Sequence, residues 1–129
     1  MANSNRVRSK KDLSQPEIEK TLRSHGFSVA STHEVGDGFP DIAVGVLGLS
    51  VLIEVKNTLK DKASEPEVKF HRAWKGQIRV AHSAKEVVLG IRAHALWLIN
   101  RLPAIVEECD RVLRLLDNSD KQEEPDEAL

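Results

Sequence analysis

The sequence has little cysteine, few aromatic residues and no long apolar run, and each shortage excludes a class of protein. Cys109 is the lone cysteine among 129 residues, so neither an internal disulfide nor a structural zinc site is expected. Arg92, His94 and Arg101 interrupt the longest apolar stretches too soon for a membrane span. Residues 1–11 are polar and basic and lack the apolar segment of a signal peptide. A cytosolic protein is therefore expected, or a nuclear one if the host has a nucleus.

Tyrosine is absent, and three phenylalanines and two tryptophans leave few rings on which nucleic-acid bases could stack. The net charge of −1 hides an uneven distribution. Residues 117–129 carry six acids and one lysine, a net charge of −5, which leaves +4 on the other 116 residues. Residues 56–101 hold ten basic and four acidic residues. This basic segment favours contacts with phosphates and with the shape of a nucleic acid over the reading of bases.

Composition divides the chain into three parts. Residues 1–13 form a flexible basic arm, residues 14–117 one domain with a C-terminal helical extension, and residues 118–129 an acidic tail expected to be disordered. Ser14 and Gly26 are typical of the start and end of a helix, and a strand is predicted over 27–32.

A β-hairpin is predicted over residues 41–56. Apolar residues alternate with small or polar ones in 41–46 and again in 49–56, with a short turn at Leu47-Gly48. A turn at this point makes the numbers of facing residues sum to 95, which places Asp41 opposite Glu54. Lys56 follows two residues later on the same face of its strand.

The remaining elements are a helix that Ser64 and Pro66 open and Gly76 ends, a strand over 77–81, and a helix that begins after Ser83. The order αβββαβ predicts an α/β fold, a mixed sheet flanked by helices, with an extra C-terminal helix. Pro103 is expected to interrupt that last helix, which then runs to about residue 117.

The C-terminal helix carries apolar residues at alternating spacings of four and three, the pattern of a helix-pairing seam. The seam comprises Ala95, Ile99, Leu102, Val106, Cys109, Leu113 and Leu116. Two interpretations remain open from the sequence. The seam joins two copies in a homodimer, or it packs on its own domain.

The predicted hairpin brings chemistry-bearing residues together. Two carboxylates, Asp41 and Glu54, would face each other about 5 Å apart at Cβ, which is unfavourable without compensation. A hard cation such as Mg²⁺ prefers carboxylate oxygens, and Lys56 beside it could orient a water or stabilise charge on a phosphate. Ala43 and Gly45 leave this face open. The pattern predicts a phosphodiester hydrolysis site; the alternative is that Glu54 and Lys56 decorate a solvated strand.

At these residues the chain resembles a known family. Gly38-Phe39-Pro40-Asp41, twelve residues and then Glu54-Val55-Lys56 look like the signature of PD-(D/E)xK nucleases. The run Phe70-His71-x-x-Trp74-x-Gly76-x-Ile78-x-Val80-x-x-Ser83 resembles small stand-alone members of the virus-type replication-repair nuclease branch (VRR-NUC), and Holliday-junction resolvases are similar in pattern. The resemblance covers about residues 15–92 and implies a restriction-endonuclease-like core.

The resemblance also implies roles for individual residues. Asp41, Glu54 and the backbone carbonyl of Val55 would bind Mg²⁺ or Mn²⁺, and Lys56 would be the catalytic lysine. Glu19 matches the family's first-helix acid, with Glu17 as the competing choice. The branch often has a glutamine in the helix after the lysine, whereas this chain has Glu67-Val68-Lys69 there. Either Lys69 replaces the glutamine or that role is absent.

The implied function is a metal-dependent DNA endonuclease that acts on branched, flapped or Holliday-junction DNA, working as a homodimer. Five cations after the metal site could neutralise DNA phosphates: Lys60, Lys62, Lys69, Arg72 and Lys75. Two alternatives remain, a non-catalytic DNA-binding or assembly module of the same fold, and a nuclease subunit of a restriction or mobile-element system.

Overall fold

The computed structural model describes residues 15–57 and 63–127, the last six of these by their backbone only. A helix over 15–24 comes first. It is followed by β1 (Ser28–Ser31), the 3-10 helix η1 (His33–Val35), β2 (Ile42–Val46), β3 (Leu49–Val55), α2 (Glu65–Ala73), β4 (Arg79–Ala81) and α3 (Ala84–Glu127). The predicted order of elements is confirmed, and η1 is an addition to it. The chain forms two compact units that divide between residues 93 and 94, inside α3.

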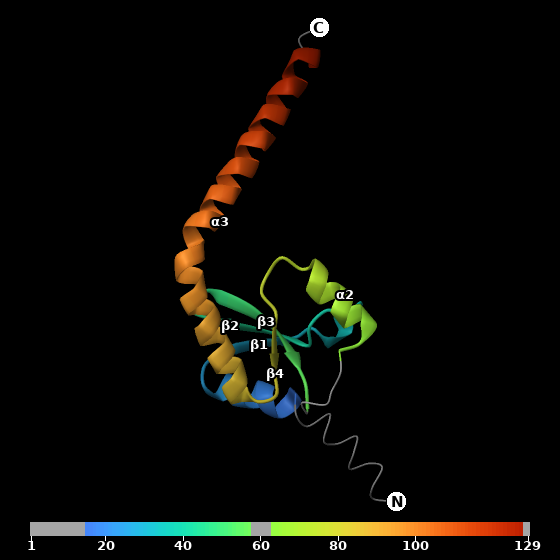
Figure 1. Ribbon diagram of the computed structural model, residues 1–129, viewed down its shortest axis with the longest axis vertical. Coiled ribbons are helices and arrows are strands. Elements are labelled where there is room, and N and C mark those ends of the chain that lie inside the picture. The colour runs from blue at the N-terminus through green and yellow to red at the C-terminus, as the bar shows by residue number, and fades with distance from the viewer. Residues whose placement is uncertain (1–14, 58–62, 128–129) are drawn as a thin grey trace, which may run out of the picture. The chain divides into compact units, whose positions relative to one another are not determined.

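The first unit is built on a four-stranded mixed sheet in the order β1-β2-β3-β4 (Figure 1). β1 pairs with β2, and β2 with β3, in antiparallel fashion, whereas β4 lies parallel to β3. Ile42 faces Ile53 and Val44 faces Val51, which confirms the predicted hairpin register. Leu47 and Gly48 both have positive φ, 48° and 84°, as the tight turn of a right-twisted hairpin requires.

One face of this sheet carries the hydrophobic core. Ile18 and Leu22 of the first helix and Val87 and Ile91 of α3 belong to one buried cluster with apolar residues of the strands, namely Ile42, Val44, Val51, Ile53 and Ala81. Because side chains alternate along a strand, residues 41, 54 and 56 point to the opposite face. The packing that stabilises the fold therefore leaves the second face of the sheet available for chemistry.

Helix α2 is held beside the loop before β2 by aromatic contacts. Phe39, in the loop before β2, packs edge-to-face on Phe70 with ring centroids 5.2 Å apart, and Phe70 stacks on Trp74 at 5.3 Å. Ser64 caps α2 as predicted, since its hydroxyl accepts a hydrogen bond from the N–H of Glu67. The cluster fixes α2 beside the loop that delivers Asp41.

Gly38 is the point of closest approach between this loop and α2. Its φ is 80°, and a Cβ at this position would collide with the backbone carbonyl of Pro66. Gly36 has a similar φ of 76°, but a Cβ there would meet open space. We expect Gly36→Ala to cost about 1–3 kcal/mol of unfolding free energy from backbone strain alone. Gly38→Ala should cost a further 1–3 kcal/mol, roughly, from the collision. Urea denaturation of both variants measures the difference, and equal losses would contradict the contact.

Helix α3 departs from the sequence expectation in two ways. It is continuous through Pro103, where an interruption was expected. A proline removes one N–H donor and crowds the preceding turn, which a long helix can absorb by bending. α3 also runs through Glu127, past the end expected near residue 117 and into the segment whose composition predicts disorder. Pro125, near the end of the helix, is the one glycine or proline between residues 117 and 127, and extending an existing helix needs no new nucleation.

Within the parts of the chain that the structure covers, no helix combines the length and the apolar character that a membrane crossing requires. The basic arm over 1–13 lies outside the described residues.

Candidate active site

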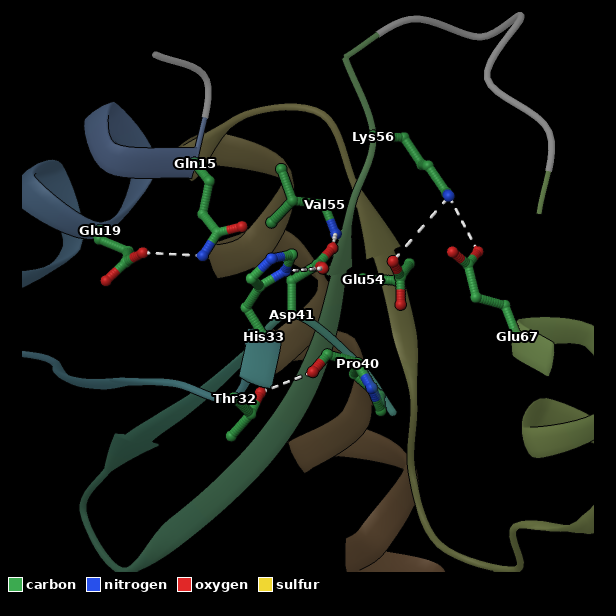
Figure 2. Close-up of polar contacts among 10 residues, drawn as sticks. All are labelled: Gln15, Glu19, Thr32, His33, Pro40, Asp41, Glu54, Val55, Lys56 and Glu67. Carbon is green, nitrogen blue, oxygen red and sulfur yellow. Dashed lines mark hydrogen bonds and ion pairs between the residues drawn. The ribbon is translucent and has the colours of Figure 1, made fainter. Parts of the chain in front are cut away.

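Asp41 is held in place by backbone contacts at the end of β1 and β3. Its Oδ2 accepts a hydrogen bond from the N–H of Val55 at 2.8 Å (Figure 2). Its backbone carbonyl accepts one from the N–H of Thr32 at 2.8 Å. The hydroxyl of Thr32 donates to the carbonyl of Pro40 at 2.6 Å. The Pro40-Asp41 pair is therefore tied to two strands, and its carboxylate has one oxygen oriented by the backbone.

Glu54 is the one charged residue that is fully buried among the described residues, with 3% of its surface exposed. Its Oε2 has no hydrogen-bond partner within that part of the chain. Burial first, and then the interaction with Asp41, raise the pKa of Glu54 to about 8. A buried carboxyl group without a partner is costly unless it stays protonated or binds a cation.

Lys56 lies between two carboxylates. Its Nζ donates to Oε2 of Glu67 at 2.9 Å and lies 3.9 Å from Oε1 of Glu54 (Figure 2). Burial lowers the pKa of Lys56, but the hydrogen bond and charge of Glu67, with the charges of Glu54 and Asp41, outweigh burial and leave that pKa raised. Lys56 is therefore charged at neutral pH and held at a defined position.

Glu67 is a site residue that the sequence analysis missed. It stands in the segment where the resemblance to VRR-NUC proteins predicts a glutamine, and its contact with Lys56 brings α2 into the site. Burial raises the pKa of Glu67, but the hydrogen bond from Lys56 outweighs it and the pKa is lowered. Lys69, the residue considered for this place, lines a separate hollow of about 440 Å³ with Asp37 and Phe70. The sequence feature that could have drawn attention to Glu67 is its position three residues after the Ser64 cap.

His33 also lies near Asp41. Its Nδ1 lies 4.0 Å from Oδ1 of Asp41, and its side chain is 75% exposed. η1 positions it there, because Thr32 links the start of η1 to Asp41. The spacing of residues in the sequence does not fix this contact, since it depends on a short 3-10 helix that periodicity does not predict.

Glu19 is held by two residues of its own helix. Its carboxylate accepts a hydrogen bond from Gln15 at 3.0 Å (Figure 2). It also pairs with Arg23 at 3.1 Å. Its side chain is 12% exposed, whereas Glu17 is exposed and lines a different hollow with His82. Between the two candidate first-helix acids, Glu19 is the one held by polar neighbours.

The described residues offer few side-chain ligands for a metal ion. No three side chains of His, Cys, Asp or Glu are grouped closely enough to hold an ion within residues 15–57 and 63–127. An ion at Asp41 and Glu54 would need backbone and water oxygens to complete its ligands, which suits Mg²⁺. Of the expected phosphate-binding cations, Lys69, Arg72 and Lys75 are exposed on or just after α2, and Lys60 and Lys62 lie outside the described residues.

The raised pKa of Glu54 predicts how the metal-free protein responds to pH. The folded protein keeps a proton on Glu54 up to about pH 8, whereas the unfolded chain loses it near 4.5. Stability from this group is therefore fully present below pH 4.5 and lost as pH rises to about 8. Denaturation series on the wild type and Glu54→Gln, in chelator, should show a steeper decline in the wild type. Parallel curves would mean that Glu54 titrates normally.

Comparison with solved structures finds one described as "VRR_NUC domain" that matches this fold with a TM-score of 0.53. The match covers 64% of this chain and 95% of that chain at 23% sequence identity. At this identity the likeness shows the fold, and it agrees with the mixed α/β architecture predicted from the sequence. No family model matches the chain, and no match was found among curated proteins.

Proposed function

We propose that the protein is a VRR-NUC nuclease of the PD-(D/E)xK type, a divalent-metal-dependent endonuclease that hydrolyses phosphodiester bonds in DNA. The observation that carries the proposal is the buried carboxyl of Glu54, with a partnerless oxygen beside Asp41 and Lys56. A role in stabilising the fold does not explain this carboxyl, because a well-packed fold avoids a buried carboxyl oxygen without a hydrogen-bond partner. The fold shared with a solved VRR_NUC domain supports the same assignment.

Asp41 and Glu54 fit a hard cation. They offer two carboxylates at one end of a rigid hairpin, and the backbone carbonyl of Val55 is the further ligand that the family resemblance implies. A bound Mg²⁺ or Mn²⁺ would polarise a phosphate oxygen and lower the pKa of a coordinated water. The protein's part is to hold Asp41 through the N–H of Val55 and to give up the proton on Glu54.

Lys56 supplies positive charge beside the reacting phosphate. Its ammonium is charged, half-enclosed and restrained by Glu67, so it can donate a hydrogen bond to a phosphate oxygen or to the attacking water with little reorganisation. Glu67 acts through Lys56, and we assign it a positioning role. Glu19 is the proposed first-helix acid, reaching the site after rearrangement of its bonds to Gln15 and Arg23.

The proposed DNA contacts are to phosphates. Lys69, Arg72 and Lys75, with Lys60 and Lys62 preceding them in the chain, form a basic group after the Asp41–Glu54 site. Branched, flapped or four-way-junction DNA is the proposed substrate class, because the chain has few rings for reading single bases and shape recognition needs only phosphate contacts. We expect two copies of the chain to cleave both strands of such a substrate, since the described residues of each copy form one Asp41–Glu54 site.

Incubation with duplex, flap and four-way-junction DNA, with Mg²⁺ or with chelator, tests the proposal. We expect internal cleavage that depends on the metal, is strongest on branched DNA and weakens as salt rises. Binding to the same DNAs without cleavage, in Mg²⁺ and in Mn²⁺, would instead support the non-catalytic module of the same fold.

A further inference from the structure

The second compact unit presents an apolar face along α3 that nothing in the described residues covers. Ile99, Leu102, Val106, Leu113 and Leu116 each expose between 52% and 65% of their surface. Leaving so many large apolar side chains in water within one short stretch of helix is unusual for a monomeric protein. We therefore expect a binding partner to cover this face.

The spacing of the apolar residues indicates that the partner is another helix. Written as a heptad, Ile99, Val106 and Leu113 fall at position a, and Ala95, Leu102, Cys109 and Leu116 at position d. The register continues through Pro103 without a break, because α3 is one helix. A 3.5-residue repeat kept in one register over three heptads matches another helix, since it holds one stripe toward a partner helix.

We propose that the occupant is α3 of a second copy of this chain, running antiparallel. In that orientation the numbers of facing residues sum to 215. Each residue at position a of one helix then faces a residue at position d of the other. Leu102 meets Leu113 of the partner subunit, Val106 meets Cys109 of the partner subunit, and Ile99 meets Leu116 of the partner subunit. A two-fold axis between residues 107 and 108 relates the two helices, and every contact occurs twice.

The flanking positions favour this orientation over the parallel one. Position g is apolar in three consecutive heptads, at Leu98, Ile105 and Val112, whereas position e carries Leu96 and Pro103 and then Asp110 and Asp117. Antiparallel helices place g beside g, so Ile105 packs on Val112 of the partner subunit. Parallel helices would place g beside e, and would set Asp110 against Ile105 of the partner subunit and Asp117 against Val112 of the partner subunit, so that two carboxylates lie on large apolar side chains. Antiparallel helices place e beside e, which sets only Asp117 on such a side chain, Leu96 of the partner subunit, and Asp110 beside Pro103 of the partner subunit.

The other face of the helix satisfies its polar groups within its own chain. Arg111 pairs with Glu108 at 2.7 Å, and the guanidinium of Arg101 lies 5.1 Å from the centre of the Trp97 ring, which stacks on His94. These residues lie outside positions a, d and g. The polar contacts given for this part of the helix therefore lie outside the proposed seam and leave it free of charged pairs.

A charge exchange tests the proposal independently of any nuclease activity. Size-exclusion chromatography with light scattering should find the full-length wild type dimeric at tens of micromolar. Leu102→Glu and Leu113→Lys should each weaken the dimer roughly 100-fold or more, because each introduces an unpaired buried charge. The double variant should regain the dimer, since the carboxylate at position 102 then faces the ammonium at position 113 of the other copy.

Leu115→Glu is the matched control, because Leu115 is 53% exposed and Leu113 56% on the same helix, but position 115 lies outside the seam. This variant should stay dimeric, and circular dichroism should show all variants equally helical. A monomeric wild type would overturn the proposal. So would a dimer that persists in both single variants. A double variant that remains monomeric would overturn the antiparallel register, since parallel helices bring like charges together.

Discussion

Glu54→Gln and Asp41→Asn should each abolish metal-dependent DNA cleavage and leave a folded protein. Each change removes one of two carboxylates that face the same point, and we expect single-turnover rates to fall roughly 10³-fold or more. The metal-free variants should be at least as stable as the wild type near pH 8. The reason is that Glu54 is destabilising there, since burial and Asp41 raise its pKa to about 8.

Glu107→Gln, which changes an exposed glutamate on α3 in the same chemical way, is the control and should cleave at the wild-type rate. Calorimetric titration with Mn²⁺ should show weaker binding in the two site variants only. Wild-type cleavage rates in either Asp41→Asn or Glu54→Gln, with Mg²⁺ saturating, would remove the basis for the metal site.

Lys56→Ala should separate chemistry from metal binding. The ammonium contacts Glu67 and Glu54 and is proposed to reach water or phosphate, so its loss should slow single-turnover cleavage by roughly 10²–10³-fold. Removing a positive charge 3.9 Å from Oε1 of Glu54 should leave Mn²⁺ affinity unchanged or slightly higher. The KM for DNA should change much less than kcat.

The unpaired carboxylate of Glu67 complicates this variant, because that side chain is only 20% exposed. Lys56→Ala/Glu67→Gln removes both charges, and it should match Lys56→Ala in rate while recovering any lost stability. Lys20→Ala, at an exposed position on the first helix, is the control. If Mn²⁺ binding collapsed while single-turnover chemistry survived, Lys56 would be a structural residue and its catalytic assignment wrong.

The hairpin could be predicted in full because its determinants are local. Alternation of apolar residues in two short runs, with Leu47-Gly48 between them, leaves one register that buries Ile42, Val44, Val51 and Ile53 together. Asp41 and Glu54 follow from that register by counting. The proximity of Asp41 and Glu54 could therefore be predicted from the sequence. The burial of Glu54 could not, since it depends on how the surrounding elements pack over the two side chains.

Glu67 and His33 show where sequence reasoning stops. Both reach the site through tertiary placement, Glu67 because the Phe39–Phe70 contact sets α2 against the loop, and His33 because η1 folds beside Asp41. Neither depends on a period or a motif that one chain displays. Pro103 shows the converse, since a strong local signal for ending a helix is overridden by good helix formers on both sides.

Anomalous diffraction from a crystal grown with Mn²⁺ tests the central claim most directly. We expect one strong peak between the carboxylates of Asp41 and Glu54, within coordination distance of the carbonyl of Val55, and no such peak in crystals of Glu54→Gln. A Mn²⁺ ion bound elsewhere, with this site holding only water at saturating metal, would contradict the assignment of Asp41 and Glu54 as the metal ligands.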